Sequence, residues 1–251
     1  MSDPFRFTTI AHADRALLGP LAPERVEALL EHIELRRHPR SRPRIVDVGC
    51  GKGEILLRAM RRLEGLGTGV EPNPAFAGAA LARARELGLA ADLVLHGRPV
   101  ERTPLPDETF DLAICTGAGH AFGETPDALA ALARLATPGG WGLFGVGYWK
   151  RTPAAEYLEC FGGSEDELRS LEVTLALPEA AGWTVASWHE STPVEWDDYE
   201  RHYAKHVRDW VATNATDPEA EAFRRRIEAW DGAYERWGRE TMGFVTLVMR
   251  R

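Results

Sequence analysis

Residues 45–54 read Ile-Val-Asp-Val-Gly-Cys-Gly-Lys-Gly-Glu, and this stretch decides the fold. Three apolar residues around Asp47 indicate a buried strand of a parallel sheet. Glycines at alternate positions then turn the chain toward a helix that opens near Glu54. Glycine allows positive φ angles and lets a ligand approach the backbone closely. The N-terminus of the following helix offers free N–H groups to an anionic part of that ligand.

Two carboxylates narrow the ligand that this turn can bind. Dinucleotide-binding folds place a third glycine where this chain has Glu54. Asp47, at the end of the strand, would repel a pyrophosphate but suits an ammonium group. Glu71 ends the next apolar run, at the spacing of about 20 residues where a carboxylate binds ribose hydroxyls. The predicted ligand has an amino-acid moiety and a ribose, which describes S-adenosylmethionine.

Four segments resemble, in order and spacing, the motifs of the class I S-adenosylmethionine-dependent methyltransferases. Residues 47–53 resemble the first motif, and Val70-Glu71-Pro72 resembles the acidic ribose-binding turn. Residues 110–115 look like the fourth strand of the family, and residues 135–141 like the turn before its fifth strand. The alternative at this level is another nucleotide-binding α/β domain, such as an NAD-dependent oxidoreductase, against which Glu54 argues.

The resemblance implies a methyltransferase enzyme with S-adenosylmethionine as its cofactor. Many members carry Gly-Asp-Ala after the third strand, where this chain has Gly97-Arg98-Pro99. Arg98 cannot accept a hydrogen bond from the adenine amine, so the backbone near Val100 or the side chain of Glu101 is expected to substitute. The cofactor-binding residues that the resemblance implies are Asp47, Gly49, Cys50, Gly51, Gly53, Glu71, Pro72, Val100, Glu101 and Thr116.

Strand and helix patterns alternate along the core of the chain, which predicts an α/β fold. We expect a doubly wound, mostly parallel sheet of seven strands, the Rossmann-like methyltransferase fold, with a helical insertion between the last two strands. Because the sixth strand runs parallel to the others in the family, the insertion should begin on the active-site side. The expected parts are an N-terminal helical cap (1–43), the cofactor-binding core (44–150), the end of the core with the sixth strand (151–192), an aromatic-rich insertion (193–239) and the last strand (240–251).

The secondary structure expected after the core comprises helices near 153–160, 164–170 and 177–181, a strand at 183–188, a helical stretch at 194–237 and a strand at 243–249.

Aromatic residues recur at helical spacing in the insertion. Trp196, Tyr199, Tyr203 and Trp210 share one predicted face, and a second stripe runs along residues 223–237. Two interpretations stay open: the helices pack their own aromatic core, or some rings line a pocket for an apolar or cationic acceptor. Both can hold for different residues.

The glycine-rich segment 116–123 follows the fourth strand, where the family borders the transferring methyl group. It contains His120, and histidine is the side chain that exchanges protons near neutral pH. We predict His120 as the catalytic residue, although it could instead cap the next helix or hold the loop. The residues expected to line the acceptor pocket are Phe122, Tyr148, Trp149 and Tyr203.

Composition restricts the partners. With 30 basic and 38 acidic residues the net charge is −8, which argues against nucleic acid and anionic membrane as partners. No Asn-Pro-Pro-Tyr sequence follows the fourth strand, so methylation of nucleic-acid bases is disfavoured. The sequence has no cluster of residues at metal-ligand spacing, so we expect no metal. The basic run at 36–44 is interpreted as a solvated linker.

The three cysteines indicate free thiols in a reducing compartment, and no signal or long apolar run is visible, so a cytoplasmic protein is expected.

The leading hypothesis from the sequence is a methyltransferase that acts on a small molecule, with the acceptor atom (O, N or S) left open. The alternatives are a regulatory protein that binds S-adenosylmethionine without turnover, and a methyltransferase that acts on a macromolecule.

Overall fold

The computed structural model describes residues 3–35 and 42–251. The predicted linker at 36–44 lies outside the described residues except for its last three. Of these, Arg42 forms an ion pair with Asp92, with 2.6 Å between the guanidinium and carboxylate groups. Among the described residues, no helix has both the length and the apolar content to cross a membrane.

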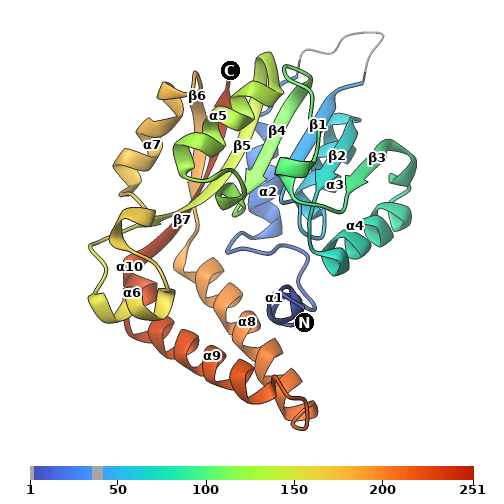
Figure 1. Ribbon diagram of the computed structural model, residues 1–251. Coiled ribbons are helices and arrows are strands. Elements are labelled where there is room, and N and C mark those ends of the chain that lie inside the picture. The colour runs from blue at the N-terminus through green and yellow to red at the C-terminus, as the bar shows by residue number, and fades with distance from the viewer. Residues whose placement is uncertain (1–2, 36–41) are drawn as a thin grey trace.

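Seven strands form one sheet in the order β3-β2-β1-β4-β5-β7-β6 (Figure 1). β7 runs antiparallel to both of its neighbours, β5 and β6, and the other pairs are parallel. β6 therefore points the same way as the central strands, as predicted. The strands are β1 (Arg44–Val48), β2 (Leu66–Val70), β3 (Leu93–His96), β4 (Phe110–Thr116), β5 (Ala136–Trp149), β6 (Thr184–Glu190) and β7 (Met242–Arg250).

Helices cover both faces of the sheet, which confirms the doubly wound fold. α2, α3 and α4 pack on one face, and α5 and α7 pack on the other. The helices are α1 (Arg6–Ala11), α2 (Pro23–Glu31), α3 (Glu54–Leu63), α4 (Pro74–Glu86), α5 (Thr125–Leu135), α6 (Ala155–Phe161), α7 (Leu171–Ala180), α8 (Pro193–Thr213), α9 (Ala220–Ala233) and α10 (Arg239–Thr241).

The pleat of β1 sends its side chains alternately to the two faces. Ile45 packs with α2 and α3, whereas Val46 and Val48 pack with α5. Asp47 lies on the same side of the strand as Ile45, at the carboxyl end of the sheet. Parallel strands bring their carboxyl ends to one edge, so β1, β2 and β4 all end close to the glycine turn.

The predicted insertion is a helical hairpin of α8 and α9 that projects from the sheet (Figure 1). The expected single stretch at 194–237 is interrupted at 214–219, where Pro218 follows Asp217. A five-residue π turn, Tyr234–Gly238, joins α9 to α10 and so to β7. Helix α1 packs against both helices of the hairpin through Phe7, whose ring lies 6.1 Å from that of Tyr203 in α8 and 5.1 Å from that of Phe223 in α9, centroid to centroid.

The short helices predicted between β5 and β6 are only partly correct. Residues 165–167 form a single 3-10 turn, and the helix expected at 177–181 begins earlier as α7. The Ser170 hydroxyl caps α7 by accepting a hydrogen bond from the Val173 N–H at 3.3 Å. Because of this cap, α7 begins before the stretch that was predicted to be helical.

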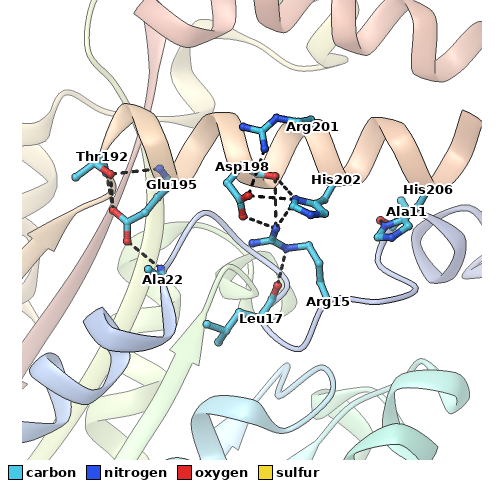
Figure 2. A network of polar contacts seen from close by, with 10 residues as sticks. All are labelled: Ala11, Arg15, Leu17, Ala22, Thr192, Glu195, Asp198, Arg201, His202 and His206. Carbon is cyan, nitrogen blue, oxygen red and sulfur yellow. Dashed lines mark hydrogen bonds and ion pairs between the residues drawn. The ribbon is translucent and has the colours of Figure 1, made fainter.

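α8 begins with a capping box that also holds the N-terminal segment. The Glu195 carboxylate accepts hydrogen bonds from the Thr192 N–H at 2.8 Å and from the Ala22 N–H at 2.9 Å (Figure 2). The Thr192 hydroxyl in turn accepts a hydrogen bond from the Glu195 N–H at 3.3 Å. One side chain therefore sets the start of α8 and the entry into α2.

We expect Glu195→Ala to lower the free energy of unfolding by about 2 kcal/mol, because it removes the cap and leaves buried donors without acceptors. Urea denaturation followed by circular dichroism measures the change. Glu228→Ala is the matched control, since Glu228 lies on the exposed side of α9 and, among the described residues, pairs only with Arg224. It should change the free energy by no more than about 0.5 kcal/mol. Equal losses in both variants would contradict this role of Glu195.

Candidate functional site

The turn between β1 and α3 lets neighbouring segments pack closely against it because three of its residues lack side chains. Gly49, Gly51 and Gly53 have φ angles of +73°, +55° and +78°. A Cβ on Gly49 would lie 2.2 Å from the Cβ of Ala118, and one on Gly51 would lie 2.6 Å from Cδ1 of Leu18. Neighbouring segments therefore close against this turn, and any larger residue would push them apart.

A groove of about 770 Å³ runs across the carboxyl ends of β1, β2 and β4. Glu71, at the end of β2, lines it and is held in place by two backbone donors. The Gly51 N–H donates to one carboxylate oxygen at 2.9 Å, and the Asn73 N–H donates to the other at 2.7 Å. Each oxygen keeps a lone pair for a further donor, such as a ribose hydroxyl.

A second cavity, of about 250 Å³, opens beside the groove. The ends of β1 and β4 form one side of it, and residues 16–21 of the N-terminal segment form another. The α8–α9 hairpin contributes Trp196, Tyr199, Glu200 and Trp230. The residues that line both cavities are Leu18, Gly49, Gly51, Thr116, Gly117 and Tyr199, so the two spaces meet beside the glycine turn and the end of β4.

Asp47 is the charged group at the centre of this arrangement. It is buried, and among the described residues its Oδ1 atom has no hydrogen-bond partner. Burial, with a smaller effect of the nearby Glu71 carboxylate, raises the pKa of Asp47 to about 8. A buried carboxylate of this kind fits an ammonium group, which would supply both the charge and the hydrogen-bond donor that it lacks.

The N-terminal segment lies across the site as a strap, which we define as residues 12–22. The Lys52 ammonium, from the glycine turn itself, donates to the backbone carbonyl oxygens of His12 at 2.6 Å and Ala13 at 2.7 Å. Arg15 forms an ion pair with Asp198 of α8 at 2.8 Å (Figure 2). The strap is thus held from the sheet on one side and from the hairpin on the other.

His12 is buried within the strap and lines the groove. Its Nε2 atom lies 3.1 Å from the hydroxyl of Tyr199, and its Nδ1 atom lies 2.8 Å from the carbonyl oxygen of Thr8. Burial lowers the pKa of His12 to about 4, so the ring is neutral at pH 7. These contacts join α1 to α8.

The structure brings together most of the residues predicted to bind the cofactor. Gly53 is the exception, because it lines neither cavity and instead lies against Ala80 of α4. The backbone near Val100 and the side chain of Glu101 border the groove, at the place expected for the adenine ring. The predicted residues that line one or both cavities are Asp47, Gly49, Cys50, Gly51, Glu71, Pro72, Val100, Glu101 and Thr116.

Three of the four residues predicted for the acceptor pocket line neither cavity. Tyr148 is buried in the core, where its hydroxyl donates to Glu190 at 2.7 Å, and the Trp149 indole N–H donates to the carbonyl oxygen of Glu165 at 2.8 Å. Phe122 packs beside the same core and, like these two, lines neither cavity. Tyr203 borders the groove and not the smaller cavity.

His120 lies in a 3-10 turn (Gly119–Phe122) and is exposed at the groove. It does not line the smaller cavity.

Sequence reasoning missed the cavity residues that come from distant parts of the chain. Glu200, Met242 and Phe244 were not singled out, although Glu200 directly follows Tyr199 of the predicted aromatic stripe. Trp230 belongs to the second predicted stripe. Trp196 and Tyr199 line the cavity, whereas Trp210 packs with Phe223 in the aromatic core of the hairpin. That the cavity binds the acceptor stays a prediction.

Comparisons with known proteins agree on one kind of protein. A family described as a methyltransferase domain matches residues 45–140. The protein YjhP of Escherichia coli (strain K12) is 28% identical over 247 residues, which cover 97% of each chain.

Two solved structures of S-adenosylmethionine-dependent methyltransferases, each in complex with S-adenosylhomocysteine, match this chain over its full length. The enzyme from Geobacter sulfurreducens is 28% identical, with a TM-score of 0.88 and 100% of both chains covered. The enzyme from Thiobacillus denitrificans is 27% identical, with a TM-score of 0.87 and the same coverage.

We expect Asp47→Asn to weaken the binding of S-adenosylhomocysteine about 100-fold, because the amide cannot neutralise an ammonium group. In the unmodified protein at pH 7 Asp47 holds a proton, so binding of the ammonium should release up to about one proton. Isothermal titration calorimetry in two buffers of different ionisation enthalpy measures both quantities. The Asn variant should release none from this position.

Folding stability provides the control. The pKa of Asp47 is higher in the folded protein than in the unfolded chain, where it is about 4. The free energy of unfolding therefore falls as the pH rises from about 4 toward 8. Asp47→Asn lacks this loss and should be at least as stable as the unmodified protein at pH 8. A destabilised variant with unchanged ligand affinity would contradict the assignment.

Proposed function

We propose that this chain, which belongs to the class I S-adenosylmethionine-dependent methyltransferases, transfers the methyl group of its cofactor to a small molecule bound in the aromatic cavity. The observation that carries the proposal is the position of this cavity. It meets the cofactor groove at the glycine turn and the end of β4, and the strap and the α8–α9 hairpin form its other walls.

The residues of the groove and of the adjoining wall of the cavity fit S-adenosylmethionine. Asp47 suits the ammonium group of the methionine part, the glycine turn allows close approach of the ligand, and Glu71 suits the ribose hydroxyls. The two similar enzymes crystallised with S-adenosylhomocysteine support the same cofactor here. When bound, S-adenosylmethionine supplies a methyl group on a positively charged sulfur, ready for in-line displacement.

The chain contributes alignment and the exclusion of water. Methyl transfer needs the reacting atoms about 3 to 3.5 Å apart in a site from which solvent is displaced. The strap supplies apolar side chains over the cavity, such as Leu17, Leu18 and Leu21. Phe244 of β7 and Trp196 of α8 supply apolar surface on other sides. An acceptor held among these residues would face the cofactor at the shared boundary of groove and cavity.

A small acceptor is favoured over a macromolecule by the charge and size of the cavity. Of the described residues, no Lys or Arg lines it, and its volume of about 250 Å³ suits a metabolite. The net charge of −8 also opposes the binding of nucleic acid.

The test mixes purified protein with S-adenosylmethionine that carries tritium in the methyl group and with the small-molecule fraction of a bacterial extract. We expect tritium in a low-molecular-weight product, and none above background with Asp47→Asn. The protein and RNA fractions of the extract are assayed in parallel. Label only in those fractions would contradict the small acceptor, and saturable cofactor binding without any labelled product would indicate a regulatory binder instead.

The prediction from the sequence that His120 is the catalytic residue has its own test. If it is the general base, His120→Ala should leave the affinity for S-adenosylhomocysteine unchanged and slow methyl transfer about 100-fold. Single-turnover rates with the labelled cofactor measure the effect. Glu101→Gln, in the neighbouring turn that also lines the groove, should weaken cofactor binding without this rate loss. Unchanged turnover in His120→Ala would assign the residue to the loop alone.

A further inference from the structure

Glu200 of α8 is a buried carboxylate that forms no ion pair among the described residues. Its side chain is 2% exposed and lines the smaller cavity. The Trp230 indole N–H donates to Oε2 of Glu200 at 2.7 Å, whereas Oε1 has no hydrogen-bond partner among the described residues. Burial of a carboxylate costs free energy unless a cation or further donors compensate. This residue therefore lacks a partner that a ligand can supply.

Three acids line the cavity, and two of them are already accounted for. Glu54 forms an ion pair with Arg58 at 2.6 Å, and Asp47 lies at the glycine turn, where it suits the ammonium of the cofactor. Glu200 is the third. It lines the cavity and not the groove, so a ligand held by it would lie on the hairpin side, away from Glu71 and the ribose position. Glu200 also borders a polar hollow lined by Arg201, Arg208 and Arg239, but these arginines pair with Asp198, Asp231 and Asp197.

The walls next to Glu200 are aromatic. Trp196, Tyr199 and Trp230 line the same cavity, and the rings of Trp196 and Tyr199 meet edge to face with centroids 6.4 Å apart. The faces of such rings carry negative charge density and attract organic cations. The indole N–H of Trp196 also lacks a partner in the described part of the chain. A carboxylate among indole and phenol rings is a site for an organic ammonium.

We propose that Glu200, with Trp196 and Trp230, binds the cationic nitrogen of an amine, and that this amine is the methyl acceptor. The inference rests on the proposed function and specifies its substrate class. An ammonium bound here gives one proton to Oε1 of Glu200. The freed lone pair then forms the N–C bond as the C–S bond breaks, and the electron pair of that bond stays on sulfur. The products are an N-methylated ammonium and S-adenosylhomocysteine, and the proton on Glu200 returns to solvent.

The protonation behaviour of Glu200 suits this exchange. Burial is the main cause that raises its pKa to about 7, while the Trp230 hydrogen bond opposes the rise and the Asp231 carboxylate adds to it. Glu200 thereby takes the role that the sequence hypothesis gives to His120, and the His120→Ala measurement separates the two assignments.

The first test uses the unmodified protein saturated with S-adenosylhomocysteine, so that the cofactor site is filled. The probes are tetramethylammonium, the neutral tert-butanol and the anionic pivalate, which are similar in size. Tryptophan fluorescence reports binding, because two of the eight Trp side chains line the cavity. We expect tetramethylammonium to change the fluorescence at concentrations at least about tenfold lower than the other probes need. Equal effects of the cation and the alcohol would overturn the proposal.

The second test compares Glu200→Gln with Glu228→Gln. The Gln at position 200 keeps an acceptor for the Trp230 N–H and removes the charge. We expect it to weaken tetramethylammonium binding about tenfold and to leave S-adenosylhomocysteine binding unchanged. Glu228→Gln, on the exposed side of α9, should change neither. Unchanged binding of tetramethylammonium by Glu200→Gln, or an equal loss for both ligands, would overturn the assignment.

Fractionation of the tritium-labelled products separates this proposal from the proposed function. Label in the small molecules retained by a cation exchanger supports the amine acceptor. Label in neutral or anionic small molecules overturns the amine assignment and leaves the proposed function standing. Label only in macromolecules, or none at all, overturns the proposed function itself, whatever the probes show.

Discussion

A carboxylate moved out of water loses hydration energy that only a cation or hydrogen-bond donors can replace. Three buried acids at the carboxyl edge of the sheet are placed under this constraint in different ways. Glu71 receives two backbone donors, whereas Asp47 and Glu200 each keep an oxygen without a partner among the described residues. The fold holds these two groups in place through the packing around them, and a charged ligand can compensate for the burial. The chemistry of the site follows from that imbalance.

Packing around the acids depends on three segments that are far apart in the sequence. Lys52 ties the strap to the glycine turn, and Arg15 ties it to α8 through Asp198. Arg6 pairs with Asp217 and Glu219 at the turn between α8 and α9, so that α1 follows the hairpin. The walls of the cavity are therefore linked to one another by ion pairs as well as by aromatic contacts. A shift of the hairpin would carry α1 and the strap with it.

The parts of the site near the glycine turn were predictable because they are local. Strand alternation and the spacing of Asp47 and Glu71 depend on the residues between them, and the strand predicted around Asp47 is observed as β1. Glu200 was not predictable in this way. Its burial results from Trp230, which lies 30 positions further on and reaches it only because the chain reverses between the two helices.

Side-chain direction explains why Tyr148 and Trp149, which were predicted to line the acceptor pocket, line neither cavity. Tyr148 and Trp149 come at the end of β5, which sequence order alone puts beside the cofactor. The antiparallel pairing with β7 brings Gly243 opposite Tyr148, and the absence of a side chain there lets the phenol ring lie over the glycine backbone and reach Glu190. The direction of these rings depends on the strand that pairs with β5, and the sequence pattern does not predict that partner.

The two ends of the α8–α9 hairpin are attached to β6 and β7, which are paired with each other in the sheet. The hairpin is thus inserted between two paired strands at one edge of the sheet, and the pairing of the strands does not fix its length. Substitutions of hairpin residues that line the smaller cavity can change its shape, while Glu71 and the β2 end of the groove stay unchanged. A single scaffold of this type is suited to diversify its choice of substrate through one continuous stretch of about fifty residues.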